Sequence, residues 1–137
     1  MKYLLDTQTC IYALKQNEAV LERMLTRSRA DVAVSVITEA ELRTGAAKSS
    51  SPVKTMRLVE NFLRPLTIVE LTSSDAVSYA SVRARLERVG TPIGPFDTLI
   101  AAQAVGRKLI LVSNNERELG RVSGLRLENW AHTRSAR

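Results

Sequence analysis

Short apolar runs alternate with amphipathic segments along most of the chain. Each run is rich in Leu, Ile or Val and is bounded by polar or turn-forming residues, a pattern typical of strands that are buried on both faces. The runs predict five strands, at residues 3–5, 32–37, 67–71, 109–112 and 125–130, of which the last is the least apolar.

The segments between these runs have helical periodicity. One predicted helix carries Cys10, and others lie at residues 18–28, 38–45, 52–63 and 97–106 and between a cap at 73–75 and Gly90. The segment 97–106 is apolar nearly all round, which indicates a central helix. Strands that alternate with helices form a parallel sheet covered on both faces. The sequence therefore predicts a three-layer α/β fold with a central parallel sheet of four to five strands, in a single domain over residues 1–137.

The charge of the chain favours a polyanionic partner. Twenty Lys and Arg residues against 14 Asp and Glu give a formal charge of +6 with the one histidine neutral. Each half of the chain holds ten basic and seven acidic residues, so the excess belongs to the folded body and not to a tail. Such an excess attracts nucleic acid first of all, although a basic surface without any nucleic-acid role remains an alternative. Six aromatic residues in all argue against a base-stacking platform for single strands.

The residue inventory excludes several kinds of catalysis. A lone cysteine, Cys10, cannot form an internal disulfide or a cysteine-rich zinc site, and a lone histidine, His132, excludes a two-histidine ribonuclease mechanism. The glycine-rich loops that cradle nucleotide phosphates are missing. No apolar run approaches the roughly 20 residues of a membrane span, and the N-terminus has no signal-peptide pattern. We therefore expect a cytoplasmic protein with no membrane partner, whose chemistry depends on carboxylates and a metal ion.

Acidic and amide side chains follow the predicted strands. Asp6 comes directly after the first strand, Glu41 lies early in the helix after the second, residues 114–115 follow the fourth, and Asp97 opens the central helix. Ligands of open α/β sheets gather at the carboxyl ends of the strands, so we expect Asp6, Glu41 and residues 114–115 to share one edge, which Asp97 joins if its helix starts there. Clustered carboxylates repel one another, and Mg²⁺ or Mn²⁺ relieves that repulsion. Such an ion can acidify water and offset charge on a phosphodiester without a histidine.

Each of these positions also has a purely structural explanation. Asp6 suits a helix N-cap, and Asp97 suits the first turn of a helix, where the helix dipole favours an acid. Glu41 fits a capping box with Thr38, and the asparagines at 114–115 fit a turn. Taken singly, each structural explanation is the more frequent one. Their joint placement at one sheet edge favours a site.

Four segments, in this order, carry a resemblance to a known family: MKYLLDTQTCIY, VSVITEAELRTGAAKS, GTPIGPFDTLIAAQA and LVSNNERELGRVSGLRLENW. Together they resemble the VapC toxins of the PIN-domain ribonuclease family over almost the full chain. The resemblance implies a PIN-like fold and metal-dependent endonucleolytic cleavage of RNA. Closely similar toxins cut initiator tRNA in its anticodon region. It also implies a homodimer, a VapB-type antitoxin that joins it in a larger complex, and operator DNA contacted only through that antitoxin.

The resemblance assigns roles to individual positions. Asp6, Glu41 and Asp97 match the metal-binding acids of the family, and a fourth acidic position, aspartate in many PIN domains, falls on Asn115. An amide is a weaker, neutral ligand, so on this assignment Asn115 positions a metal-bound water or the substrate. Smaller departures from the family pattern occur at four positions: Gln8, Ser113, Leu119 and Glu39.

Glu39 and Glu41 lie two residues apart on one predicted helix, roughly 200° apart around its axis. They cannot both point into one cleft, and we assign Glu41 to the site and Glu39 to solvent. Three arginines on the helix that ends at Gly90, at positions 83, 85 and 88, form a solvated face or guide RNA phosphates.

Two other functions are compatible with the same residues. The first is a non-catalytic nucleic-acid-binding module, in which the acids cap helices and the basic surface alone acts. The second is an interaction protein that acts only inside its antitoxin complex, as a co-repressor. Removal of metal separates them from a nuclease, because EDTA stops metal-dependent cleavage but leaves binding by a module intact.

Overall fold

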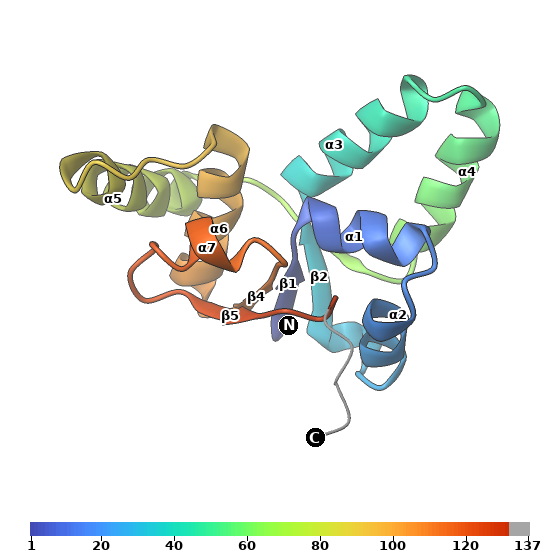
Figure 1. Ribbon diagram of the computed structural model, residues 1–137, viewed down its shortest axis with the longest axis horizontal. Helices are drawn as coiled ribbons and strands as arrows, with labels where there is room; N and C mark the ends of the chain where they lie inside the picture. Colours follow the sequence, from blue (N-terminus) through green and yellow to red (C-terminus); the bar gives the residue numbers. More distant parts are fainter. Residues whose placement is uncertain (132–137) are drawn as a thin grey trace.

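A computed structural model describes residues 1–131, so His132 and the last part of the predicted domain lie outside the described residues. Its five strands form one parallel sheet in the order β3-β2-β1-β4-β5 (Figure 1). In chain order the strands are β1 (Tyr3–Leu5), β2 (Val32–Ser35), β3 (Thr67–Val69), β4 (Ile110–Val112) and β5 (Arg126–Glu128). All five lie within the predicted runs, and the predicted parallel sheet is confirmed.

Helices cover both faces of this sheet, as predicted. Figure 1 shows the first four helices on one side of the sheet and the last three on the other. The first group is α1 (Thr7–Leu14), α2 (Glu18–Leu25), α3 (Val36–Ala47) and α4 (Pro52–Leu63), with a 3-10 turn at Arg29–Asp31 before β2. The second group is α5 (Ser73–Arg88), α6 (Pro95–Arg107) and α7 (Glu116–Leu119). No helix within residues 1–131 is both long enough and apolar enough to cross a membrane.

Alternate strand residues serve two separate cores. Tyr3 and Leu5 pack with the helices of the first group, whereas Leu4 packs with those of the second. Because both faces are covered, β1 is buried along its whole length, which explains why its sequence is apolar without alternation. Cys10 is fully buried in the first core and serves there as a small apolar residue.

The main departure from the predicted elements lies between β2 and α3. Residues 36–37 were expected to extend the strand, but they begin the helix, because the Ser35 hydroxyl accepts a hydrogen bond from the backbone N–H of Ile37 at 3.1 Å. The helix thus begins before Thr38, and the capping box proposed for Thr38 and Glu41 does not form. The helix also continues past Gly45 to Ala47.

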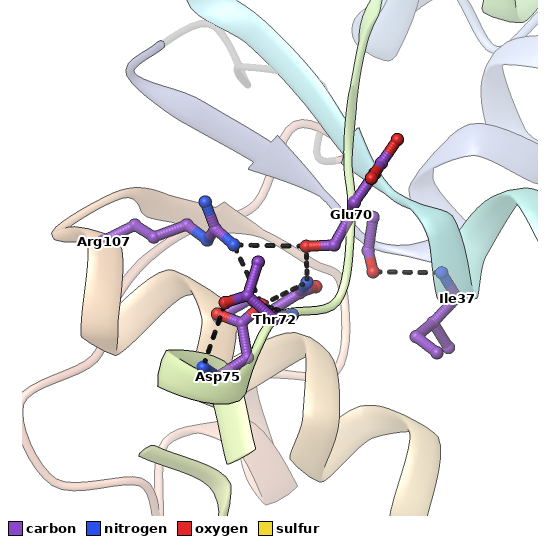
Figure 2. A network of polar contacts seen from close by, with 7 residues as sticks. Ile37, Glu70, Thr72, Asp75 and Arg107 are labelled. Carbon is purple, nitrogen blue, oxygen red and sulfur yellow. Dashed lines mark hydrogen bonds and ion pairs between the residues drawn. The ribbon is translucent and has the colours of Figure 1, made fainter. Parts of the chain in front are cut away.

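A buried polar network ties α5 to α6 (Figure 2). Asp75, 3% exposed, receives hydrogen bonds from Arg107 at 2.9 Å and from Gln103 at 3.3 Å. Asp75 also accepts from the backbone N–H of Thr72 at 2.9 Å, which completes a capping box at the start of α5. Burial alone would raise the pKa of Asp75, but these hydrogen bonds and the charge of Arg107 outweigh it and lower the pKa.

We expect Asp75→Asn to lower the free energy of unfolding by about 2–4 kcal/mol at neutral pH, because it removes the partner of Arg107. Breaking a fully buried ion pair costs roughly 3–5 kcal/mol, and Arg107, whose side chain is 29% exposed, keeps part of its hydration. Since the pKa is lowered in the fold, the stabilisation is complete above the unfolded pKa of about 3.9 and is lost as the pH falls through the folded value. Urea unfolding should therefore give a difference in the free energy of unfolding between the wild type and Asp75→Asn that disappears in acid. A difference in the free energy of unfolding that stays constant into strong acid would contradict a stabilising charge on Asp75.

Candidate active site

The candidate site lies at the carboxyl ends of the three central strands. Leu5, the last residue of β1, is in register with Val34 of β2 and Val112 of β4. The residues that follow these strands therefore meet at one edge, as the sequence predicts. Asp6 and Ser113 are the first residues beyond β1 and β4, and both are buried.

Asp6 is the most enclosed of the predicted site residues, with 5% of its surface exposed. It is the N-cap of α1 and accepts a hydrogen bond from the backbone N–H of Thr9 at 2.9 Å. Burial nevertheless raises the pKa of Asp6, although hydrogen bonds from Ser113 and Thr9 oppose the rise. The structural role as a cap is thus real, but it does not offset the cost of burying this charge. Asn or Ser would cap the helix without that cost.

Glu41 lies on the second turn of α3 and faces α1. The Thr7 hydroxyl donates a hydrogen bond to Glu41 Oε1 at 2.6 Å and lies 3.2 Å from the Thr38 hydroxyl. Thr7 directly follows Asp6, so this bond brings the end of β1 and the helix after β2 together. Because this capping box is absent, the explanation of Glu41 as the partner of Thr38 in a capping box is wrong.

Asp97 is the third residue of α6, because the helix begins at Pro95, two residues earlier than predicted. The pKa of Asp97 is raised, first by partial burial and then by the negative charges of Asp6, Glu41 and Glu118. An acid in the first turn of a helix is ordinarily stabilised by the helix dipole. The raised pKa instead shows that three other carboxylates are close enough to repel this one.

Glu118 is the site residue that the sequence analysis missed. It lies in the one-turn helix α7, and the predicted site residue Asn115 is the N-cap of that helix. The Asn115 side chain donates to Glu118 Oε1 at 3.0 Å and accepts from the backbone N–H of Glu118 at 3.4 Å. Both polar atoms of Asn115 are therefore occupied with Glu118. The turn explanation for Asn115 holds in part, since it starts α7, and the fourth carboxylate near the site comes from Glu118.

Ser113 links the two halves of this edge. Its side chain forms a hydrogen bond with Asp6 and accepts another from the backbone N–H of Asn115 at 2.9 Å. The departure from the family pattern at this position therefore leaves a hydroxyl group in contact with the site. The same hydroxyl fixes the start of the turn that carries Asn115 and Glu118.

Glu39 does not belong to the carboxylate cluster, as predicted. Its side chain pairs with Arg43 at 2.9 Å, and Arg43 also pairs with Glu60 of α4 at 3.3 Å. Glu39 was expected to point to solvent, but its side chain is only 24% exposed and takes part in this bridge between α3 and α4.

Hard cations are the ligands that fit this donor set. Carboxylate oxygens are the groups that Mg²⁺ and Mn²⁺ prefer, and the raised pKa values of Asp6 and Asp97 mark a repulsion that a divalent cation relieves. Within residues 1–131 no three His, Cys, Asp or Glu side chains already stand as a preformed metal-binding group. The carboxylates thus affect one another's pKa, but their side chains are not arranged as a preformed metal site.

Comparison with known proteins agrees with this geometry. The model of the PIN domain family matches residues 3–125. The chain is 37% identical over 130 residues to the tRNA(fMet)-specific endonuclease VapC of Salmonella typhimurium, covering 95% of this chain and 98% of that protein. It is 41% identical over 130 residues to the ribonuclease VapC2 of Haemophilus influenzae, with the same coverage.

Solved structures show the same fold. A DNA-bound VapBC structure from Salmonella typhimurium superposes with a TM-score of 0.91 at 39% identity, over 95% of this chain and 98% of the other. VapBC2 of Rickettsia felis, bound to a DNA fragment from its promoter, superposes with a TM-score of 0.88 at 34% identity, over 95% and 99% of the two chains. By sequence and by structure, the chain belongs to the PIN-domain family, among its VapC ribonucleases.

Proposed function

We propose that the chain is the toxin of a type II toxin-antitoxin pair and a metal-dependent endoribonuclease. The observation that carries this proposal is the convergence of carboxylates at the edge where β1, β2 and β4 end. The pKa of Asp97 is raised there, first by partial burial and then by the charges of Asp6, Glu41 and Glu118. Such repulsion is unfavourable for folding and is typical of a functional site. A module that only binds nucleic acid through its basic surface has no need of it.

Asp6, Glu41 and Asp97 would hold the ion, Mg²⁺ or Mn²⁺, with Glu118 as a fourth acid nearby. When bound, the ion supplies Lewis acidity toward a phosphodiester and toward water. The chain itself places and orients the acids. The Thr7 hydroxyl holds Glu41, Ser113 and Thr9 hold Asp6, and Asn115 holds Glu118.

The substrate we propose is initiator tRNA, cut in its anticodon region. Support comes from the relatives of Salmonella typhimurium and Shigella flexneri, each 37% identical and named tRNA(fMet)-specific endonuclease. The net charge of +6 is suited to a polyanion of this kind. With this substrate, we infer that the protein acts in the cytoplasm.

The protein partner we propose is a VapB-type antitoxin. Solved relatives are toxin-antitoxin complexes, two of them bound to DNA. In our proposal the toxin is a homodimer, the antitoxin joins it in a larger complex, and operator DNA is reached only through the antitoxin.

Cleavage of purified tRNA tests the proposed function. Initiator tRNA and elongator methionine tRNA would be incubated with the purified chain in Mg²⁺ or in EDTA. We expect cleavage of the initiator tRNA in Mg²⁺ only. Binding of RNA without cleavage in Mg²⁺ would favour the non-catalytic module. Absence of cleavage together with a DNA effect seen only with the antitoxin would favour the co-repressor.

Glu118→Gln and Asn115→Ala should each reduce the cleavage rate about tenfold, because the first removes a charge beside Asp97 and the second releases Glu118. The double variant should be no slower than the slower single one, since both changes act through the same carboxylate. Single-turnover rates in Mg²⁺ would measure these effects. Glu22→Gln, on an exposed face of α2, is a matched control. Additive losses would show that Asn115 acts independently of Glu118.

A further inference from the structure

A groove lies along α5, a helix on the opposite side of the sheet from α1–α4 (Figure 1). It has a volume of about 380 Å³ and is lined on one side by α5 and on the other by the segment between α7 and β5. Its floor is apolar, with Leu86 and Val122 among the lining residues, and its polar groups are hydroxyls and guanidinium groups. These are contributed by Ser81, Ser123, Arg85 and Arg121.

The walls of this groove are held in place. The α5 helix packs so closely on α6 that a side chain on Gly106 would lie 2.6 Å from the Ser78 hydroxyl. The Asp75–Arg107 ion pair fixes the start of the same helix. The α5 wall of the groove is therefore held firmly against α6.

Among the described residues, the two arginines of the groove lack the carboxylate partner that Arg83 and Arg107 have. Arg83 pairs with Glu87 at 2.8 Å, and Arg107 pairs with Asp75 at 2.9 Å. In the part of the chain that the structure describes, neither Arg85 nor Arg121 pairs with a carboxylate. An arginine whose charge is not neutralised within the protein is available to a phosphate, to which it can donate two parallel hydrogen bonds.

Arg121 also connects the groove with the carboxylate edge. It follows Glu118 by three residues, and its guanidinium group donates to the backbone oxygen of Pro92 at 3.5 Å. Pro92 belongs to the loop that leads into α6 and Asp97. Arg121 thus contacts the loop that leads into the helix of Asp97.

We propose that this groove binds the phosphodiester backbone of the RNA substrate, with Arg85 and Arg121 each contacting a phosphate and the serine hydroxyls donating further hydrogen bonds. The proposal rests on the proposed function, because it takes RNA as the substrate, and it assigns substrate-binding residues that lie outside the carboxylate cluster. These contacts position the RNA and carry no sequence information themselves.

The salt dependence of RNA binding tests this proposal. The probe is a synthetic hairpin with the anticodon stem-loop of initiator tRNA, and Asp97→Asn is present in every protein to prevent cleavage. Adding Arg85→Gln should weaken binding about three- to tenfold near physiological salt. It should also make the slope of log Kd against log salt shallower by about 0.7–0.9, the contribution of one phosphate contact. Adding Arg121→Gln as well should weaken binding about ten- to 100-fold in total, because independent losses multiply, and should make the slope shallower by about 1.4–1.8.

Arg57→Gln is the matched control, since Arg57 is exposed on α4, at the opposite end of the molecule from α5 in Figure 1. It removes the same charge, and it should leave the slope unchanged. Equal slopes for Arg85→Gln and the parent would overturn the proposal. So would a dimer that dissociates on Arg85→Gln at an unchanged RNA slope, since the groove would then be an interface between two copies of the chain.

The two proposals fail separately. If the wild-type chain does not cleave tRNA, the proposed function fails, while the binding slopes still report on the groove. If the wild-type chain cleaves but the slopes are equal, the function stands and the groove is not an RNA site. Circular dichroism of each variant confirms that the fold is retained.

Discussion

Replacement of Asp97 by Asn is expected to lower the rate of RNA cleavage at least about 100-fold, equivalent to roughly 2.7 kcal/mol of barrier. The side chain keeps its shape but loses its charge and thus its strength as a ligand for a hard cation. Stability should be unchanged or slightly increased, because the negative charges of Asp6, Glu41 and Glu118 no longer act on a charged neighbour. Asp6→Asn should have the same effect on cleavage. Single-turnover rates and thermal unfolding measure the two outcomes.

Asp31→Asn controls for the type of substitution, because Asp31 lies in the turn before β2 at the opposite end of the strands from the site. It should cleave at the wild-type rate. If Asp97→Asn keeps more than about a tenth of the wild-type rate, Asp97 does not bind the ion directly.

A comparison of Glu41→Gln with Glu39→Gln tests which acid of α3 serves the site. Glu41→Gln should reduce cleavage about 100-fold with little change in melting temperature, because the amide oxygen can still accept the hydrogen bond from Thr7. Glu39→Gln should leave cleavage within about twofold of the wild type. It loses only a partly exposed ion pair with Arg43, and such pairs contribute little to stability.

The reverse result, with Glu39→Gln inactive and Glu41→Gln active, would show that the wrong glutamate has been assigned to the metal site. Equal losses in both variants would instead indicate that the ion-pair bridge between α3 and α4 controls the position of the whole helix.

The sheet and its functional edge could be predicted because the three central strands, β1, β2 and β4, are buried along their whole length. A run such as residues 109–112 has few alternatives, and its parallel neighbours bring the following residues to one edge. The position of Asp6 follows from this rule alone, whereas Asp97 follows no strand and is placed by the start of α6. The opposite faces of Glu39 and Glu41 follow from helical geometry, and the structure bears this out.

Other features depend on contacts that the sequence does not reveal. Val36 and Ile37 are β-branched and extend the strand pattern, but the Ser35 hydroxyl ends the strand by capping the helix. One turn of helix, α7, is too short to leave a periodic signal, so Glu118 was missed. An available signal was its position three residues after Asn115, the spacing of an N-cap and the third residue of a helix.

Sequencing of new 5′ ends in total cellular RNA tests the central claim most directly, because it does not presuppose the target. The purified chain and its Asp97→Asn variant would each be incubated with the RNA in Mg²⁺ or in EDTA. We predict new 5′ ends at one position in the anticodon region of initiator tRNA, seen only with the wild-type chain in Mg²⁺. The same ends in EDTA, or with the Asp97→Asn variant, would contradict a metal-dependent ribonuclease site built on these carboxylates.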